Sequence, residues 1–128
     1  MASSRDPGRV LIADDEPQIG TLLREVLTRQ GYAVETCRDG EAALEKFRHG
    51  GISLLILDVV MPHKTGIEVI HELRAQGEMV PILLMSSFLT DEVLESCKGI
   101  EHLAFLQKPF SLYELGSTIE RLLRAVRC

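Results

Sequence analysis

Short apolar runs alternate with longer amphipathic stretches along most of the chain. The apolar runs cover residues 9–13, 32–37, 52–57, 80–85 and 103–106. The amphipathic stretches cover residues 17–30, 41–48, 67–75, 91–97 and 112–126. Runs such as LLIL at 54–57 and ILLM at 82–85 lack polar alternation, which is typical of strands that are covered on both faces. The pattern predicts five strand and helix pairs around a central parallel sheet.

The first and last amphipathic stretches each carry an apolar face at helical spacing. These faces predict that the two helices bury Ile19, Leu22, Leu23, Val26 and Leu27, and Leu112, Leu115, Ile119, Leu122 and Leu123. Pro17 suits a first helical position, because its missing N–H would have no partner there. Asp39 and Gly40 predict the start of the second helix, and Gly77 the end of the third.

Composition and charge narrow the class of protein. The chain has 128 residues, of which 45% are apolar and 26% charged, as is ordinary for one globular domain. Its net charge of −5 makes direct binding to nucleic acid or to an anionic membrane improbable. The three cysteines form no CxxC pair, which fits a reducing cytoplasm. We expect a disordered leader over residues 1–8, one domain over residues 9–127, and no membrane span.

Polar residues follow the predicted strands at one end. Asp14 and Asp15 follow the first strand, Asp58 the third, Ser86 the fourth, and Lys108 the fifth. Because the carboxyl ends of parallel strands share one edge of a sheet, we expect these side chains to converge there. Taken alone, such an aspartate pair is more often a solvated turn or a helix cap than a metal site, and Asp15 could be the cap of the first helix.

Three carboxylates at one edge repel one another unless a cation enters. Magnesium prefers oxygen ligands, so this set favours a Mg²⁺ site, with Mn²⁺ as a possible substitute. With the metal bound, Asp58 is a carboxylate nucleophile that is suited to attack phosphorus, helped by the charge of Lys108.

Four short motifs, in order and on this strand and helix repeat, carry a resemblance. ADDE at 13–16, LDVVMP at 57–62, MSS at 85–87 and KPF at 108–110 resemble the receiver domain of two-component response regulators. The resemblance covers about residues 9–124. It implies a flavodoxin-like, doubly wound (βα)5 fold with a parallel five-stranded sheet of order 2-1-3-4-5, and a receiver domain over residues 9–127.

The resemblance also implies a role for each site residue. Asp58 is the expected phosphoacceptor, and Lys108 pairs with it or with the phosphoryl group. Asp15, Asp58 and the backbone carbonyl of Val60 are the expected direct ligands of magnesium, with Asp14 acting through water. The Lys108–Pro109 peptide bond is expected to be cis.

A conformational switch is part of the same resemblance. Ser86 is expected to hydrogen-bond the phosphoryl group, and Phe105 to turn inward when it does. From its place on a short apolar strand alone, core packing is the default role of Phe105, and both roles can hold because a switch aromatic packs in one state and is exposed in the other. The implied partners are a sensor histidine kinase or phosphotransfer protein, and a downstream protein or fused output domain. Either a monomer or a weak dimer through the last two helices is expected. The implied protein is a cytoplasmic switch and not an enzyme with an external substrate.

Four residues depart from the family pattern. Val60 and Phe88 stand where polar side chains are common, and this apolar cover is expected to slow loss of the phosphoryl group. Glu101 and His102 replace a small pair before the last strand, which makes the docking of the fourth helix uncertain.

Other functions stay open from sequence alone. A flavodoxin-like electron carrier needs a phosphate cradle where this chain has Asp14, Asp15 and Glu16. An aspartyl phosphohydrolase needs a second acid where Val60 stands. A scaffold that is never phosphorylated, or a receiver cut from a longer regulator or hybrid kinase, are the remaining alternatives.

Overall fold

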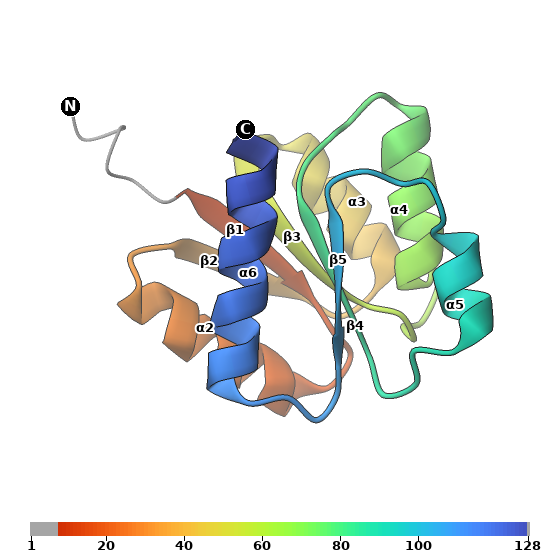
Figure 1. The fold of residues 1–128 in the computed structure, drawn as a ribbon. Coiled ribbons are helices and arrows are strands. Elements are labelled where there is room, and N and C mark those ends of the chain that lie inside the picture. Colours follow the sequence, from red (N-terminus) through yellow and green to blue (C-terminus); the bar gives the residue numbers. More distant parts are fainter. Residues whose placement is uncertain (1–7, 128) are drawn as a thin grey trace.

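The computed structural model describes residues 8–127 as alternating strands and helices (Figure 1). The elements are β1 (Arg9–Ala13), α2 (Pro17–Arg29), β2 (Ala33–Cys37), α3 (Gly40–Arg48), β3 (Ile52–Asp58), α4 (Gly66–Ala75), β4 (Ile82–Ser86), α5 (Asp91–Ser96), β5 (Leu103–Gln107) and α6 (Leu112–Arg127). Each lies within two residues of its predicted bounds. Apart from Gly8, the leader predicted over residues 1–8 lies outside the described residues.

The five strands form one parallel sheet, and the predicted strand order is confirmed. The order is β2-β1-β3-β4-β5, so β1 lies between β2 and β3. Leu11 pairs with Leu55 of β3, and Leu57 with Leu84 of β4, which keeps the carboxyl ends of the central strands level. The connections that leave β1 and β2 run in opposite directions across the sheet, so the strand order reverses at β1. In doubly wound folds, functional groups gather at this point.

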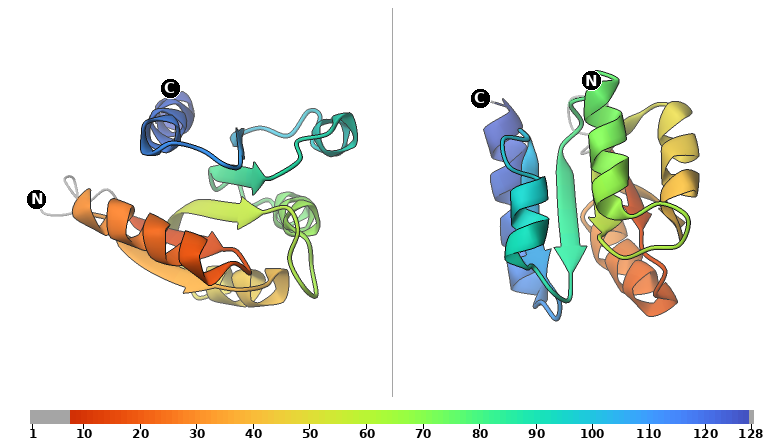
Figure 2. Two further views of the ribbon diagram at one scale, coloured as in Figure 1. Left: turned by 90° about the horizontal axis from the view of Figure 1, so that it is seen from below. Right: turned by 90° about the vertical axis from the view of Figure 1, so that its right-hand side faces the viewer.

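Helices cover both faces of the sheet, as the views in Figures 1 and 2 show. Alternate strand residues pack into two separate cores. Val10, Ile12, Leu54 and Ile56 pack with Leu23 of α2 and residues of α6. On the other face, Leu11, Leu55, Leu57 and Leu84 pack with residues of α3 and α4. Burial on both faces explains the unbroken apolar runs.

Two predicted core residues are wrong. Leu22 is 41% exposed and Leu112 is 52% exposed. Leu22 lies about 100° around α2 from the buried Leu23, at the margin of the apolar face. Leu112 is the first residue of α6, where the chain has only just left the edge of the sheet. Both helices otherwise bury the expected side.

Local signals fix the loops that lead to the site. Asp39 caps α3 by accepting a hydrogen bond from the N–H of Ala42 at 2.7 Å. Thr65 and Glu68 form a capping box at the start of α4. A Cβ atom at Gly66 would overlap the carbonyl oxygen of Asp58, so a glycine there lets α4 begin directly behind the end of β3. Within residues 8–127, no helix is long and apolar enough to cross a bilayer.

Candidate functional site

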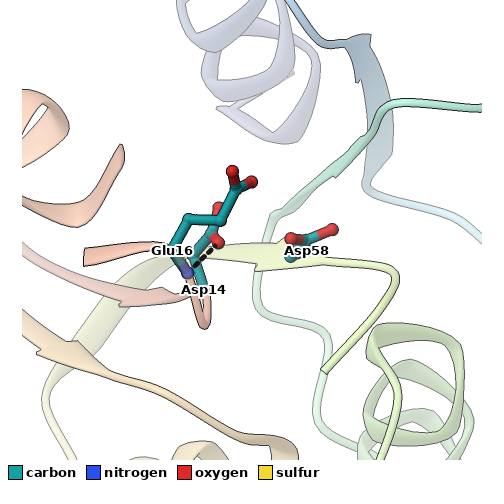
Figure 3. Close-up of side chains that lie close together, drawn as sticks. All are labelled: Asp14, Glu16 and Asp58. Atoms are coloured by element: carbon teal, nitrogen blue, oxygen red, sulfur yellow. Dashed lines mark hydrogen bonds between the residues drawn. The ribbon is translucent and has the colours of Figure 1, made fainter. Parts of the chain in front are cut away.

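The predicted site residues lie at the carboxyl ends of four strands. Asp14 follows β1, Asp58 ends β3, Ser86 ends β4 and Lys108 follows β5. The structure brings Asp14, Asp58 and Lys108 into direct contact and adds Glu16, which was not among the predicted site residues. Figure 3 shows that the three carboxyl groups come from two strand ends and the loop after β1.

The ammonium group of Lys108 joins these carboxylates. Its Nζ lies 2.8 Å from Asp14 Oδ2, 2.8 Å from Glu16 Oε1 and 3.0 Å from Asp58 Oδ2. Lys108, Asp14 and Asp58 are buried, whereas the Glu16 side chain is 50% exposed. The site is therefore a buried ion cluster with one half-exposed member, Glu16.

The loop after β1 explains how Glu16 reaches the cluster. Asp14 Oδ1 accepts a hydrogen bond from the N–H of Glu16 at 2.8 Å, which turns the chain at this point. Glu16 is the residue that precedes α2, but its side chain makes no capping bond and is free to meet Lys108. The alternative that Asp15 caps this helix is wrong. The third acid in ADDE was the one available signal for Glu16.

Burial and the charged partners shift the pKa values of Asp14 and Lys108 in opposite directions. Burial raises the pKa of Asp14, and the hydrogen bond from Lys108 offsets part of that rise. Burial by itself would lower the pKa of Lys108, but its hydrogen bonds to Asp14, Glu16 and Asp58 raise it above the ordinary lysine value. Lys108 is therefore a fixed positive charge at neutral pH.

The donor set suits a hard divalent cation. Oxygen atoms of Asp14, Glu16 and Asp58 all lie within 4.8 Å of one another, and carboxylate oxygens are the ligands that Mg²⁺ prefers. One ammonium balances only one of three ionised carboxylates, so negative charge remains for a metal to neutralise. Asp15 is exposed and lies outside this group, so its role as a direct ligand stays a prediction.

Both oxygens of Asp58 have partners. Oδ2 contacts Lys108, and Oδ1 accepts a hydrogen bond from the N–H of Val60 at 3.2 Å. Two apolar side chains on the neighbouring loops are open to solvent, since Val60 is 69% and Phe88 76% exposed. Val60 occupies the place where a phosphohydrolase would need its second acid, which disfavours that alternative.

Ser86 ends β4 and Phe105 lies within β5, and their switch roles stay predictions. The Ser86 hydroxyl bonds the backbone of Phe88, donating to its carbonyl and accepting from its N–H, each at 3.0 Å. The backbone N–H of Lys108 donates to the Ser86 carbonyl at 2.8 Å. Phe105 is half-buried against the core under α3 and α4. The Lys108–Pro109 peptide bond is cis, as expected.

Comparison with known families decides between the candidate classes. Residues 10–120 match the response regulator receiver domain. The chain belongs to this family. One curated relative is the transcriptional regulatory protein RprY of Bacteroides fragilis, which is 38% identical over 93% of this chain and 50% of RprY. Another is the alkaline phosphatase synthesis transcriptional regulatory protein PhoP of Bacillus subtilis, which is 41% identical over 91% of this chain and 48% of PhoP.

A solved structure agrees with the family assignment. Response regulator protein TrrA from Thermotoga maritima, in complex with Mg²⁺ and BeF, is 35% identical with a TM-score of 0.79, over 89% of this chain and 97% of TrrA. The receiver domain is thus a phosphoacceptor in two-component signalling, generally a switch and not a true enzyme, and it implies a histidine kinase partner. The chain spans about half the length of the curated relatives named above.

Proposed function

We propose that Asp58 accepts a phosphoryl group from a sensor histidine kinase or phosphotransfer protein in a Mg²⁺-dependent reaction. The domain then changes conformation and controls a protein partner. The observation that supports this most strongly is the bond between Lys108 and Asp58 inside a buried group of carboxylates. A cation held beside a buried carboxylate can stabilise the negative charge that a phosphoryl group brings to that carboxylate.

The metal is the finer part of the proposal. Asp15, Asp58 and the carbonyl of Val60 would hold Mg²⁺ directly, Asp14 would hold it through water, and Mn²⁺ could take its place. The cluster of Asp14, Glu16 and Asp58 and the Mg²⁺ in the TrrA complex support a metal at this edge of the sheet, and the division into direct and water-mediated ligands rests on the family resemblance. When bound, Mg²⁺ supplies charge neutralisation at the phosphoryl oxygens.

The chain's own residues perform the transfer. An ionised oxygen of Asp58 attacks phosphorus, a P–O bond forms, and the bond between phosphorus and the donor's histidine nitrogen breaks. The imidazole that leaves keeps the electron pair of that bond. Lys108, freed from part of its contact with Asp58, pairs with the new phosphoryl oxygens, since a dianion attracts it more strongly than one carboxylate.

Ser86 and Phe105 convert the new charge into a shape change. The Ser86 hydroxyl leaves the backbone of Phe88 and donates to a phosphoryl oxygen. Phe105, which lies half-buried on the edge strand β5, moves further inward as the β4–α5 loop follows Ser86. The bond from Lys108 N–H to the Ser86 carbonyl connects the two strand ends that take part.

The surroundings of the domain follow from the same proposal. The receiver unit extends over residues 9–127 and works in the cytoplasm. Its output passes through a separate protein or a fused domain, without direct binding of nucleic acid by this unit, which carries a net charge of −5. It acts as a monomer or as a weak dimer through α5 and α6, the last two helices.

Intact mass after incubation with acetyl phosphate and Mg²⁺ tests the proposal. We expect wild type to gain one phosphoryl group, and both Asp58→Asn and metal-free wild type to gain none. Asp91→Asn, at the exposed start of α5, is the matched control and should behave as wild type. If folded, magnesium-loaded wild type gains no mass, or if Asp58→Asn gains as much as wild type, the assignment of Asp58 is wrong.

A further inference from the structure

A cavity of about 320 Å³ lies between α2 and the carboxyl end of β2, on the opposite side of β1 from β3 and Asp58. Its walls come from α2, from the end of β2 and from Asp14, which follows β1. Among the polar side chains that line it, the proposed phosphoacceptor chemistry uses only that of Asp14. The polar residues that line it are Asp14, Thr21, Arg24, Thr36, Cys37 and Arg38. Its volume is at the lower end of the range for small-molecule sites, roughly 300–1,000 Å³.

Two guanidinium groups in this cavity have no acidic partner within residues 8–127. Arg24 Nη2 makes a long hydrogen bond of 3.4 Å to Thr36 Oγ1, and the structure gives it no carboxylate. Arg38 has neither a hydrogen bond nor an ion pair from its side chain among these described residues. In a chain with a net charge of −5, two uncompensated arginines beside one cavity are a local positive centre.

The other lining groups do not cancel this charge. Asp14 is the one carboxylate among the lining residues; it shares the Lys108 ammonium with Glu16 and Asp58, and the two arginine charges exceed its single charge. Burial raises the pKa of the Cys37 thiol to about 11, so it is neutral at physiological pH. Thr21 and Thr36 add hydroxyl donors. Guanidinium forks together with hydroxyl groups are the donors that suit a phosphate group.

We propose that this cavity binds a small anion that carries a phosphate group, either free phosphate or a simple phosphate monoester. Arg24 and Arg38 hold the phosphate oxygens from the two sides of the cavity, and Thr36 donates from its wall. Pro17 and Gly20 leave an uncharged floor beside them for a small organic group. The site is separate from Asp58 and needs no metal.

A phosphate titration in the presence of a metal chelator tests this site. Without a metal, the carboxylates around Lys108 repel phosphate, so saturable binding belongs to the cavity. The probe is sodium phosphate at constant ionic strength, followed by ¹H–¹⁵N NMR of the whole chain. We expect saturable shifts at the amides of Gly20, Arg24, Cys37 and Arg38, and little change at Asp58.

Matched arginine variants give the comparison. Arg24→Gln and Arg38→Gln should each weaken phosphate binding about tenfold, since each removes a charge-assisted contact. Arg29→Gln is the control, because Arg29 lies on the same helix but pairs with Glu25 at 3.6 Å and does not line the cavity. The dispersion of each variant's NMR spectrum shows whether it is folded.

Three results would overturn the proposal. The first is shifts that rise linearly and are matched by chloride, which would make Arg24 and Arg38 ordinary solvated side chains. The second is equal binding by all three arginine variants. The third is saturable shifts at Asp58 and Lys108 alone. A second titration with glycerol 3-phosphate separates the two ligand sources, because tighter binding than free phosphate assigns the site to an ester and weaker binding to free phosphate.

Discussion

The ends of β1 and β3 differ sharply from the side of the sheet formed by α5 and β5. At the first, Asp14, Asp58 and Lys108 are buried and joined by bonds of 2.8–3.0 Å. At the second, none of the six residues of α5 is buried, and the first three residues of the edge strand β5 are only half-buried. The charged centre is thus held rigidly, while the neighbouring edge has little packing to hold it in one position.

β5 is held by its ladder to β4, whereas a few side-chain contacts from α4 connect α5 and the turn before β5 to the rest of the molecule. His71 Nε2 of α4 lies 2.9 Å from the carbonyl oxygen of Ser96 at the end of α5. Arg74 of α4 donates to the carbonyls of Glu101 and His102, at 2.9 and 3.2 Å. The turn at Glu101 and His102, where the sequence departs from the family pattern, is therefore anchored to α4. Among residues 8–127, the opposite end of α5, toward Ser86, has no such side-chain hydrogen bond to another helix or strand.

The largest effect is expected from removal of the central charge. Lys108→Met should lower the free energy of unfolding by about 3–5 kcal/mol without metal, because it leaves buried carboxylates without a counter-ion. Urea unfolding with and without Mg²⁺ measures this loss, and Mg²⁺ should recover part of it. Lys64→Met is the control, since Lys64 pairs with Glu72 away from the buried cluster, and its loss should be much smaller. Equal losses of unfolding free energy in the two variants would show that the buried cluster around Lys108 is no more important for stability than the ion pair of Lys64.

A pair of leucine truncations compares the packing of the two regions directly. Leu57→Ala, directly before Asp58 and fully buried, should cost about 3 kcal/mol. Leu94→Ala on α5, where the side chain is 41% exposed, should cost less than about 1 kcal/mol. Both are measured by urea unfolding. A cost at Leu94 as large as that at Leu57 would mean that α5 is as firmly packed as the central strands.

The smallest effect is expected from a change of the apolar side chain of Val60, two residues after Asp58. Val60→Asn should shorten the lifetime of the phosphorylated form severalfold, because an amide can orient an attacking water. This change corresponds to a fall of less than about 1.4 kcal/mol in the barrier to hydrolysis. Loss of the phosphoryl group is followed by intact mass after the donor is removed. Val60→Ile keeps the apolar cover and should retain the long lifetime. An unchanged lifetime in Val60→Asn would show that this cover does not control water access.

The strands and helices could be predicted because burial on both faces leaves a clear pattern. The bounds of β1 and the start of α2 at Pro17 follow from local signals alone. Leu22 was placed wrongly because it lies at the margin of the apolar face of α2, and Leu112 because periodicity does not show where a sheet ends. Glu16 was missed because its contact with Lys108 depends on a turn set by Asp14 and on a lysine far away in sequence. Such contacts between distant loops have no periodic signature.

The central claim is that charge on Asp58 is converted into movement of the loosely packed side. Amide hydrogen exchange of the phosphorylated chain tests it most directly, with intact mass on the same sample to verify phosphorylation. Acetyl phosphate and Mg²⁺ should change exchange across residues 86–107, while α3 stays unchanged, and Asp58→Asn or Mg²⁺ alone should leave both regions as they were. Full phosphorylation without any change over residues 86–107, or with an equal change in α3, would contradict the account.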